Sequence, residues 1–362
     1  MAQQQHVGRI LELDGFRAIA VSMVMLEHMV DGWPLPEGAT AWMPGILRGV
    51  ISHGWLGVDL FFILSGFLIT GILLDEREHA NYFRNFYGRR ALRILPLAIV
   101  CIAIWWLTYG HPYGRYFLLA LIFCANLDVL FGVPTPHGPG VLWSLAVEEH
   151  FYLVWPIAVR VFSRYGLLIA ALAVVILSPL ARAWAFAKGM RADDVYQLSW
   201  FRFDGLALGA ILAIWIRTPS FTPRTVSAVV VLWLAVIALL TVATIPYGVL
   251  QPRSLTSVAL RYPQAQGIFA GAMALALAYQ GVPLLAPLRS GVAQFIAKLS
   301  YCLYLVHRPL GDLYYWTLGR MGIEGGSLAL RSMVIIAASF GVAILSQKYL
   351  EAPFMRLRGR FR

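Results

Sequence analysis

The chain has 362 residues, of which 59% are hydrophobic and 13% are charged, whereas an ordinary soluble domain carries roughly 25% charged residues. This composition excludes a soluble globular protein, a disordered protein, a disulfide-stapled secreted domain and a coiled coil. The formal net charge of +11 is explained by basic cytoplasmic loops of a membrane protein, so no nucleic-acid partner is expected.

Eleven stretches of the chain come close to the roughly 20 apolar residues that a helix needs to cross a bilayer. They lack the alternation of a strand, and unpaired backbone groups are costly in lipid, so the predicted class is all-α, a polytopic membrane helical bundle. The stretches are 14–30, 50–74, 91–108, 116–131, 141–159, 166–185, 199–216, 226–245, 263–285, 295–318 and 328–350. We expect one integral-membrane domain over residues 1–362, without a soluble domain.

The basic residues of the loops predict how many of these stretches cross. If all eleven cross from a cytoplasmic N-terminus, the loop Lys and Arg residues divide equally between the two sides. If 116–131 stays out, being the shortest and carrying Asn126 and Asp128, most of them fall inside, as the positive-inside rule requires. The prediction is therefore about ten crossings of the cytoplasmic (inner) membrane, with both termini cytoplasmic.

The first stretch carries charged residues where lipid should be. Ionisable groups inside a membrane cost about 2.5 to 3.5 kcal/mol on insertion scales, so they mark a cavity, a pathway or an active site. Arg17 and His28 are eleven residues apart, which on a helix means about 20° of azimuth and roughly 16 Å of rise. Asp14 precedes Arg17 by three residues, within ion-pair reach. The alternative is a helix whose polar ends meet the headgroups.

The stretch 141–159 carries a second polar stripe. Its members recur at helical spacing and are Ser144, Glu148, Tyr152 and Trp155. Glu148 lies on this face, whereas Glu149 is rotated by about 100°, so Glu148 is the candidate for an inward role. Adjacent carboxylates are costly in a hydrophobic span without polar partners. The alternative is that the stretch begins in an interfacial loop, which leaves the carboxylates partly in water.

A third stripe lies in the stretch 295–318. It consists of Ser300, Tyr304 and His307. The neighbouring Arg308 can pair with Asp312, four residues further on. Two interpretations of His307 stay open: a structural histidine bonded to another helix, and a histidine that contacts substrate.

Two further groups of charged residues have strong structural interpretations. Asp59, Arg202 and Asp204 are predicted to form ion pairs between packed helices. The segment FRNFYGRRALRILP holds four arginines in ten residues, Arg84, Arg89, Arg90 and Arg93. Such a cluster sets orientation and binds anionic lipid headgroups, or it clamps a phosphorylated cytosolic ligand, because guanidinium groups bind phosphate bidentately. The three cysteines lie far apart in apolar stretches and predict neither a disulfide framework nor a metal site.

Seven stretches together resemble the membrane-bound acyltransferase-3 family of bacterial O-acyltransferases. In chain order they are LDGFRAIAV, GVDLFFILSGFLIT, FYGRRALRILP, WSLAVEEHFYLVWP, RFDGLALG, SYCLYLVHRPL and EAPFMR. The resemblance implies about ten helices and transfer of an acyl group, usually acetyl from acetyl-CoA, to a hydroxyl of a carbohydrate or macrolide-like product, with no tightly bound cofactor. The family's arginine and histidine map onto Arg17 and His28, and its carboxylate maps onto Glu148. His150 stands where many relatives have glutamine, and we expect no esterase-like C-terminal domain of the kind that some relatives carry within residues 1–362.

Acyl transfer to an alcohol needs a base, and a neutral histidine serves near pH 7. We expect His28 to be the general base and Glu148 to bond its imidazole, while Arg17 binds a CoA phosphate or places the thioester. Arg89, Arg90 and Arg93 are the candidates for the nucleotide end of acyl-CoA. Candidates for acceptor contacts are Asp14, Tyr152, Tyr304 and His307. A covalent acyl-enzyme and self-association into a homo-oligomer stay open. The rival function is a transporter or flippase that uses the same residues as a proton or substrate pathway.

Overall fold

The computed structural model describes residues 10–34, 38, 40–251, 253–323 and 327–361. Within these ranges the chain forms helices and no strand. The α-helices are α1 (Leu11–Asp31), α2 (Gly45–Ser52), α3 (Gly57–Asp75), α4 (Tyr82–Tyr109), α5 (Gly114–Leu121), α6 (Leu142–Val161), α7 (Arg164–Ala187), α8 (Ala192–Gln197), α9 (Phe203–Trp215), α10 (Pro223–Thr244), α11 (Leu255–Ala278), α12 (Gly291–Arg320), α13 (Leu328–Ser346) and α14 (Ala352–Arg356). The predicted all-α class is confirmed.

By length and composition alone, five segments of the described chain qualify to cross a membrane, or six if one bent pair of helices counts as a single span. The five are Gly45–Asp75, Tyr82–Tyr109, Arg164–Ala187, Pro223–Tyr247 and Leu328–Arg360, and the bent pair is Leu255–Ala278 with Pro283–Arg289. The long helices α1, α6 and α12 are not among them, and they carry the three polar stripes. The protein is thus a multi-pass helical membrane protein, whereas the ten crossings and the cytoplasmic termini stay predictions.

The stretch 116–131 does not form a spanning helix. It contains most of the eight-residue α5, a helix about 12 Å long, followed by the short 3₁₀-helix η2 (Ala125–Phe131). Asn126 and Asp128, the polar residues that argued against a crossing, are both buried in η2. The structure therefore agrees with the prediction that this stretch stays out of the count of crossings.

The chain divides into two compact units, each assembled from separate parts of the sequence. Unit 1 combines Met1–Ala18, Asp59–Tyr82 and Val147–Phe295, and unit 2 combines Ile19–Val58, Phe83–Ala146 and Ile296–Arg362. Because this division concerns compactness and not independent folding, the single domain over residues 1–362 stays a prediction.

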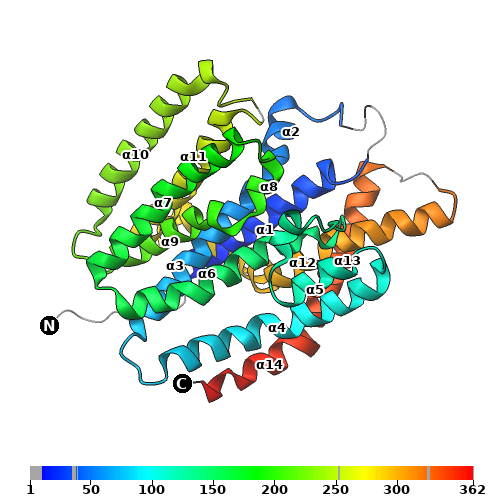
Figure 1. Cartoon of the computed structure of the whole chain (residues 1–362), viewed down its shortest axis with the longest axis horizontal. Coiled ribbons are helices and arrows are strands. Elements are labelled where there is room, and N and C mark those ends of the chain that lie inside the picture. Colours follow the sequence, from blue (N-terminus) through cyan, green and yellow to red (C-terminus); the bar gives the residue numbers. More distant parts are fainter. Residues whose placement is uncertain (1–9, 35–37, 39, 252, 324–326, 362) are drawn as a thin grey trace. The chain divides into compact units, whose positions relative to one another are not determined.

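In unit 1, α7, α9, α10 and α11 lie side by side (Figure 1). Helix α3 packs closely against α9 because glycines replace side chains at the contact. Gly66 faces the backbone of Leu206, and Gly209 faces the backbone of Ile63, so a Cβ at either glycine would collide. Close approach of small residues is the usual way in which helices associate in lipid.

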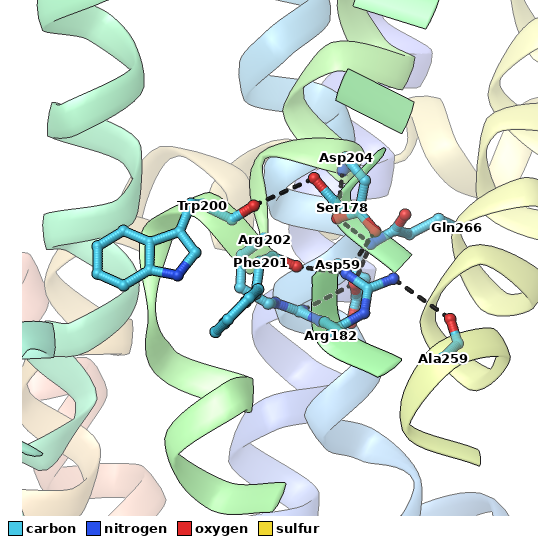
Figure 2. A network of polar contacts seen from close by, with 10 residues as sticks. Asp59, Ser178, Arg182, Trp200, Phe201, Arg202, Asp204, Ala259 and Gln266 are labelled. Carbon is cyan, nitrogen blue, oxygen red and sulfur yellow. Dashed lines mark hydrogen bonds and ion pairs between the residues drawn. The ribbon is translucent and has the colours of Figure 1, made fainter. Parts of the chain in front are cut away.

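A buried polar network crosslinks the helices of unit 1 (Figure 2). Arg202 donates to Asp59 at 2.8 Å, and Arg182 donates to Asp204 at 2.7 Å. Gln266 lies between the two pairs and donates to both carboxylates, at 2.8 and 3.1 Å. All five residues are buried. The prediction that Asp59, Arg202 and Asp204 form ion pairs between helices is confirmed, and Arg182 of α7 and Gln266 of α11 complete the network.

Candidate active site

The most distinctive polar contact of unit 2 joins two histidines. His28, near the end of α1, places its Nδ1 2.8 Å from Nε2 of His307 on α12. The ring centroids are 5.0 Å apart. His28 was expected to be a base, but helical spacing alone could not identify His307 as its partner. Of the two interpretations left open for His307, the structure favours a histidine bonded to another helix.

The second nitrogen of His307 fixes the protonation of this pair. His307 Nδ1 lies 3.0 Å from the carbonyl oxygen of Leu303, and because a carbonyl oxygen only accepts, Nδ1 must carry the hydrogen. In the neutral ring Nε2 is then bare and accepts from His28 Nδ1. A neutral His28 therefore has its own Nε2 unprotonated, and this atom is the basic nitrogen of the pair.

The side chain of His28 is partly exposed, whereas that of its partner is enclosed. The side chain of His28 is 17% exposed, while His307 is completely buried. Nε2 of His28 lies 3.4 Å from a carboxylate oxygen of Glu27, an oxygen that accepts no hydrogen bond from the described residues. Only His28 can therefore meet a substrate directly, and a proton that it takes up would sit beside a carboxylate.

The other two polar stripes also meet in unit 2. Ser144 of α6 shares a hydrogen bond of 2.7 Å with the hydroxyl of Tyr304 on α12. The Tyr304 ring lies 6.0 Å from the His307 ring. Ser300 instead bonds back to its own helix, at the Ala297 carbonyl. Tyr304 thus stands beside the histidine pair, and its role in acceptor binding stays a prediction.

The expected ion pair between Arg308 and Asp312 is wrong for the described residues. Asp312 takes other donors, while Arg308 forms no ion pair there and its buried Nε has no hydrogen-bond partner. Arg308 interacts with Asp312 and Glu27 only electrostatically, beyond ion-pair distance, and it has an electrostatic interaction with His28 as well. The helical spacing of four was right, but the carboxylate is closer to loop and α4 donors than to the guanidinium. A positive charge without an ion pair therefore stands near the histidine pair.

The remaining predicted site residues lie in unit 1 or on α4. Arg17 forms the predicted ion pair with Asp14 at 3.5 Å. Tyr152 is buried on α6 and its hydroxyl bonds to Ser65. Glu148 is partly buried one turn before Tyr152. The placement of Arg17 and Glu148 beside His28 stays a prediction.

The basic cluster occupies the start of α4 in unit 2. Arg89 and Arg90 are partly buried, whereas Arg93 is exposed. Arg89 donates to the carbonyl of Phe361 at 2.9 Å, and α14 lies beside α4 (Figure 1). The cluster and the C-terminal residues therefore lie next to each other in unit 2, whereas the side of the membrane on which they lie stays a prediction. Among the described residues, no group of three or more His, Cys, Asp or Glu is arranged to hold a metal ion.

Residues 10–347 match a protein family described as an acyltransferase domain. The peptidoglycan O-acetyltransferase OatA of Listeria monocytogenes is 28% identical, over 95% of this chain and 55% of the relative. The O-acetyltransferase OatA of Staphylococcus aureus is 27% identical, over 95% of this chain and 57% of the relative. The chain thus spans little more than half the length of these curated relatives. No solved structure matches the chain.

Proposed function

This protein belongs to the acyltransferase-3 family of membrane acyltransferases, and from that premise we propose that it transfers an acetyl group from acetyl-CoA to a hydroxyl of a saccharide. The saccharide class is supported by two relatives that are named as O-acetyltransferases, one of them of peptidoglycan. A macrolide-like acceptor is the second candidate that the family resemblance implies.

The observation that carries the proposal is the bare Nε2 of His28, in a side chain that is partly exposed. Nε2 takes the proton of the acceptor hydroxyl, and the acceptor oxygen attacks the thioester carbonyl carbon. A carbon–oxygen bond forms, the carbon–sulfur bond breaks, and the proton passes from His28 to the departing thiolate. His307 acts through His28: it holds the ring by accepting from Nδ1, as an outer partner does for a catalytic histidine.

Negative charge develops on the carbonyl oxygen during the attack and needs a positive group nearby. We assign this role to Arg308, because it interacts electrostatically with His28 and forms no ion pair within the described residues. Arg17 is assigned to the thioester or a CoA phosphate, Glu148 to the imidazolium of His28, and Arg89, Arg90 and Arg93 to the nucleotide end. These assignments follow from the residue chemistry and the family motif.

The test is transfer by the purified protein in detergent, from radiolabelled acetyl-CoA to a peptidoglycan glycan fragment. We expect label on the fragment without any membrane gradient, because the chemistry needs no sealed compartment. If no donor concentration gives labelled glycan, and sealed vesicles that contain the protein take up the substrate instead, the protein is a transporter and not an acetyltransferase. The same assay without acceptor separates the two routes, since stable label on the chain would exclude a purely direct transfer.

A further inference from the structure

A further histidine of unit 2, His137, takes part in a cluster of contacts that has no role in the proposed mechanism. Two side-chain hydrogen bonds join the α1 region to α12: His28 with His307, and Trp33 with Asp312 at 2.9 Å. Trp33 follows His28 by five residues, and Asp312 follows His307 by five residues. The second contact is therefore about 7.5 Å further along α12. Gly311 faces the Trp33 ring with no room for a side chain.

Asp312 is surrounded by donors. Oδ1 accepts from Trp33 Nε1 at 2.9 Å and from His137 Nδ1 at 2.7 Å. Oδ2 accepts from the Tyr109 hydroxyl at 2.6 Å and from the Gly138 backbone N–H at 2.8 Å. Each oxygen therefore has two donors, which fills the acceptor capacity of an ionised carboxylate. Asp312 is a fixed negative acceptor with no site left for a ligand.

This carboxylate fixes the tautomer of His137. Because Nδ1 donates to Asp312, the neutral ring of His137 has a bare Nε2, and this atom has no hydrogen-bond partner among the described residues. The side chain is 47% exposed, and it acts electrostatically on His28. A Cβ at the following Gly138 would collide with Tyr109, Asp312 and Pro309, so the loop reaches this position only with glycine.

The site fits a hydroxyl group better than a charged one. A bare imidazole nitrogen accepts a hydrogen bond from an O–H donor, and the nearby Asp312 charge repels phosphate or carboxylate. In the predicted topology, the loop that carries His137 lies on the outer side of the membrane. A saccharide carries several hydroxyls on one ring, so one acceptor can present both a reacting hydroxyl and a second hydroxyl that binds.

We propose that His137 Nε2 binds a second hydroxyl of the saccharide acceptor, while the reacting hydroxyl meets His28. Asp312 is the positioning residue that holds the His137 ring by Nδ1. The inference rests on the proposed function and adds the residue that selects which hydroxyl is acetylated. The competing explanation is structural: His137 only fastens its loop to α12, and Nε2 has no role.

Two substitutions separate these explanations. His137→Asn keeps a donor at the position of Nδ1 and removes Nε2, whereas His137→Ala removes both. Loss of one hydrogen bond to a hydroxyl predicts that both variants raise the acceptor KM by about 3- to 10-fold. The acceptor-independent hydrolysis of acetyl-CoA should stay unchanged. The matched control is His53→Asn, since His53 is also exposed and its Nδ1 also bonds, to the Gly49 carbonyl.

The decisive measurement compares a saccharide acceptor with analogues that each lack one hydroxyl. One analogue should lose about the same factor in kcat/KM with the wild-type protein and lose nothing further with His137→Asn. If His137→Asn behaves as wild type, or if the variants also lose donor hydrolysis, His137 is structural and the inference is overturned. If the wild-type protein transfers nothing to any saccharide, the proposed function has failed and the inference falls with it, which is a distinguishable result.

Discussion

His28 Nδ1 lies 2.8 Å from His307 Nε2 in a hydrogen bond. Its direction follows from the Leu303 carbonyl, which accepts from the other ring nitrogen of His307. The direction matters because it leaves Nε2 of His28 as the bare nitrogen. In the proposed mechanism, a buried neutral histidine takes the orienting role that a carboxylate has in many hydrolases. The partner is uncharged, so it fixes the ring without adding a further buried ion.

The first prediction concerns His307. His307→Leu removes the acceptor for His28 Nδ1 and should lower kcat by about 10- to 100-fold, the usual effect of losing an outer partner. His307→Gln places an amide oxygen near the former Nε2 and should recover most of kcat. Steady-state kinetics with acetyl-CoA measure both variants. A raised acceptor KM with normal kcat would instead make His307 a residue that contacts the acceptor.

Glu148 gives the second prediction. If its carboxylate stabilises the imidazolium of His28, Glu148→Gln should lower kcat by about 100-fold or more while leaving the donor KM unchanged. The measurement is kcat at saturating acetyl-CoA, with protein abundance checked by immunoblot of membranes. An unchanged kcat would contradict this role and favour the alternative, in which Glu148 lies partly in water at the membrane interface.

The third prediction concerns the start of α4. Replacement of Arg89 and Arg90 by glutamine should raise the acetyl-CoA KM about 10-fold or more, because charge-assisted bonds to phosphate contribute about 1.5 to 3 kcal/mol each. Arg320→Gln, at the exposed far end of α12, is the control. Arg89 also bonds to the Phe361 carbonyl, so Arg90→Gln alone should show the same direction. An unaltered KM in both variants would leave the cluster with an orienting role only.

The fourth prediction tests the buried network of unit 1. Asp204→Ala leaves the completely buried Arg182 without its ion-pair partner, which should destabilise the fold by about 3 to 5 kcal/mol. Thermal unfolding in detergent measures the change. Asp193→Ala removes an exposed partner of Arg191 and Arg253 and should change stability by about 1 kcal/mol or less. Equal melting temperatures for the two variants would contradict a structural role of the network.

Much of the fold follows from local sequence patterns. Apolar runs and the missing strand alternation predicted an all-α membrane protein, and the polar residues Asn126 and Asp128 marked the stretch that forms only short helices. The Asp14–Arg17 ion pair also follows from helical spacing. Such contacts are predictable because both partners lie on one helix, where the geometry is fixed.

The pairing of His28 with His307 was not predictable in the same way. The two residues are separated by 279 positions in the chain, and helical spacing says nothing about which helix lies opposite. Arg308 and Asp312 show the converse, because the correct spacing did not produce an ion pair where loop donors competed for the carboxylate. One signal was present: the equal five-residue spacing of His28 with Trp33 and of His307 with Asp312.

The most direct test of the account is the acetyl-transfer rate of His28→Ala, measured with purified protein, labelled acetyl-CoA and a glycan fragment. Loss of the base predicts a fall in kcat of about 100- to 10,000-fold, with normal abundance in the membrane and an unaltered melting temperature. A variant that folds normally and keeps transfer near the wild-type rate would show that the proton leaves the acceptor by another route.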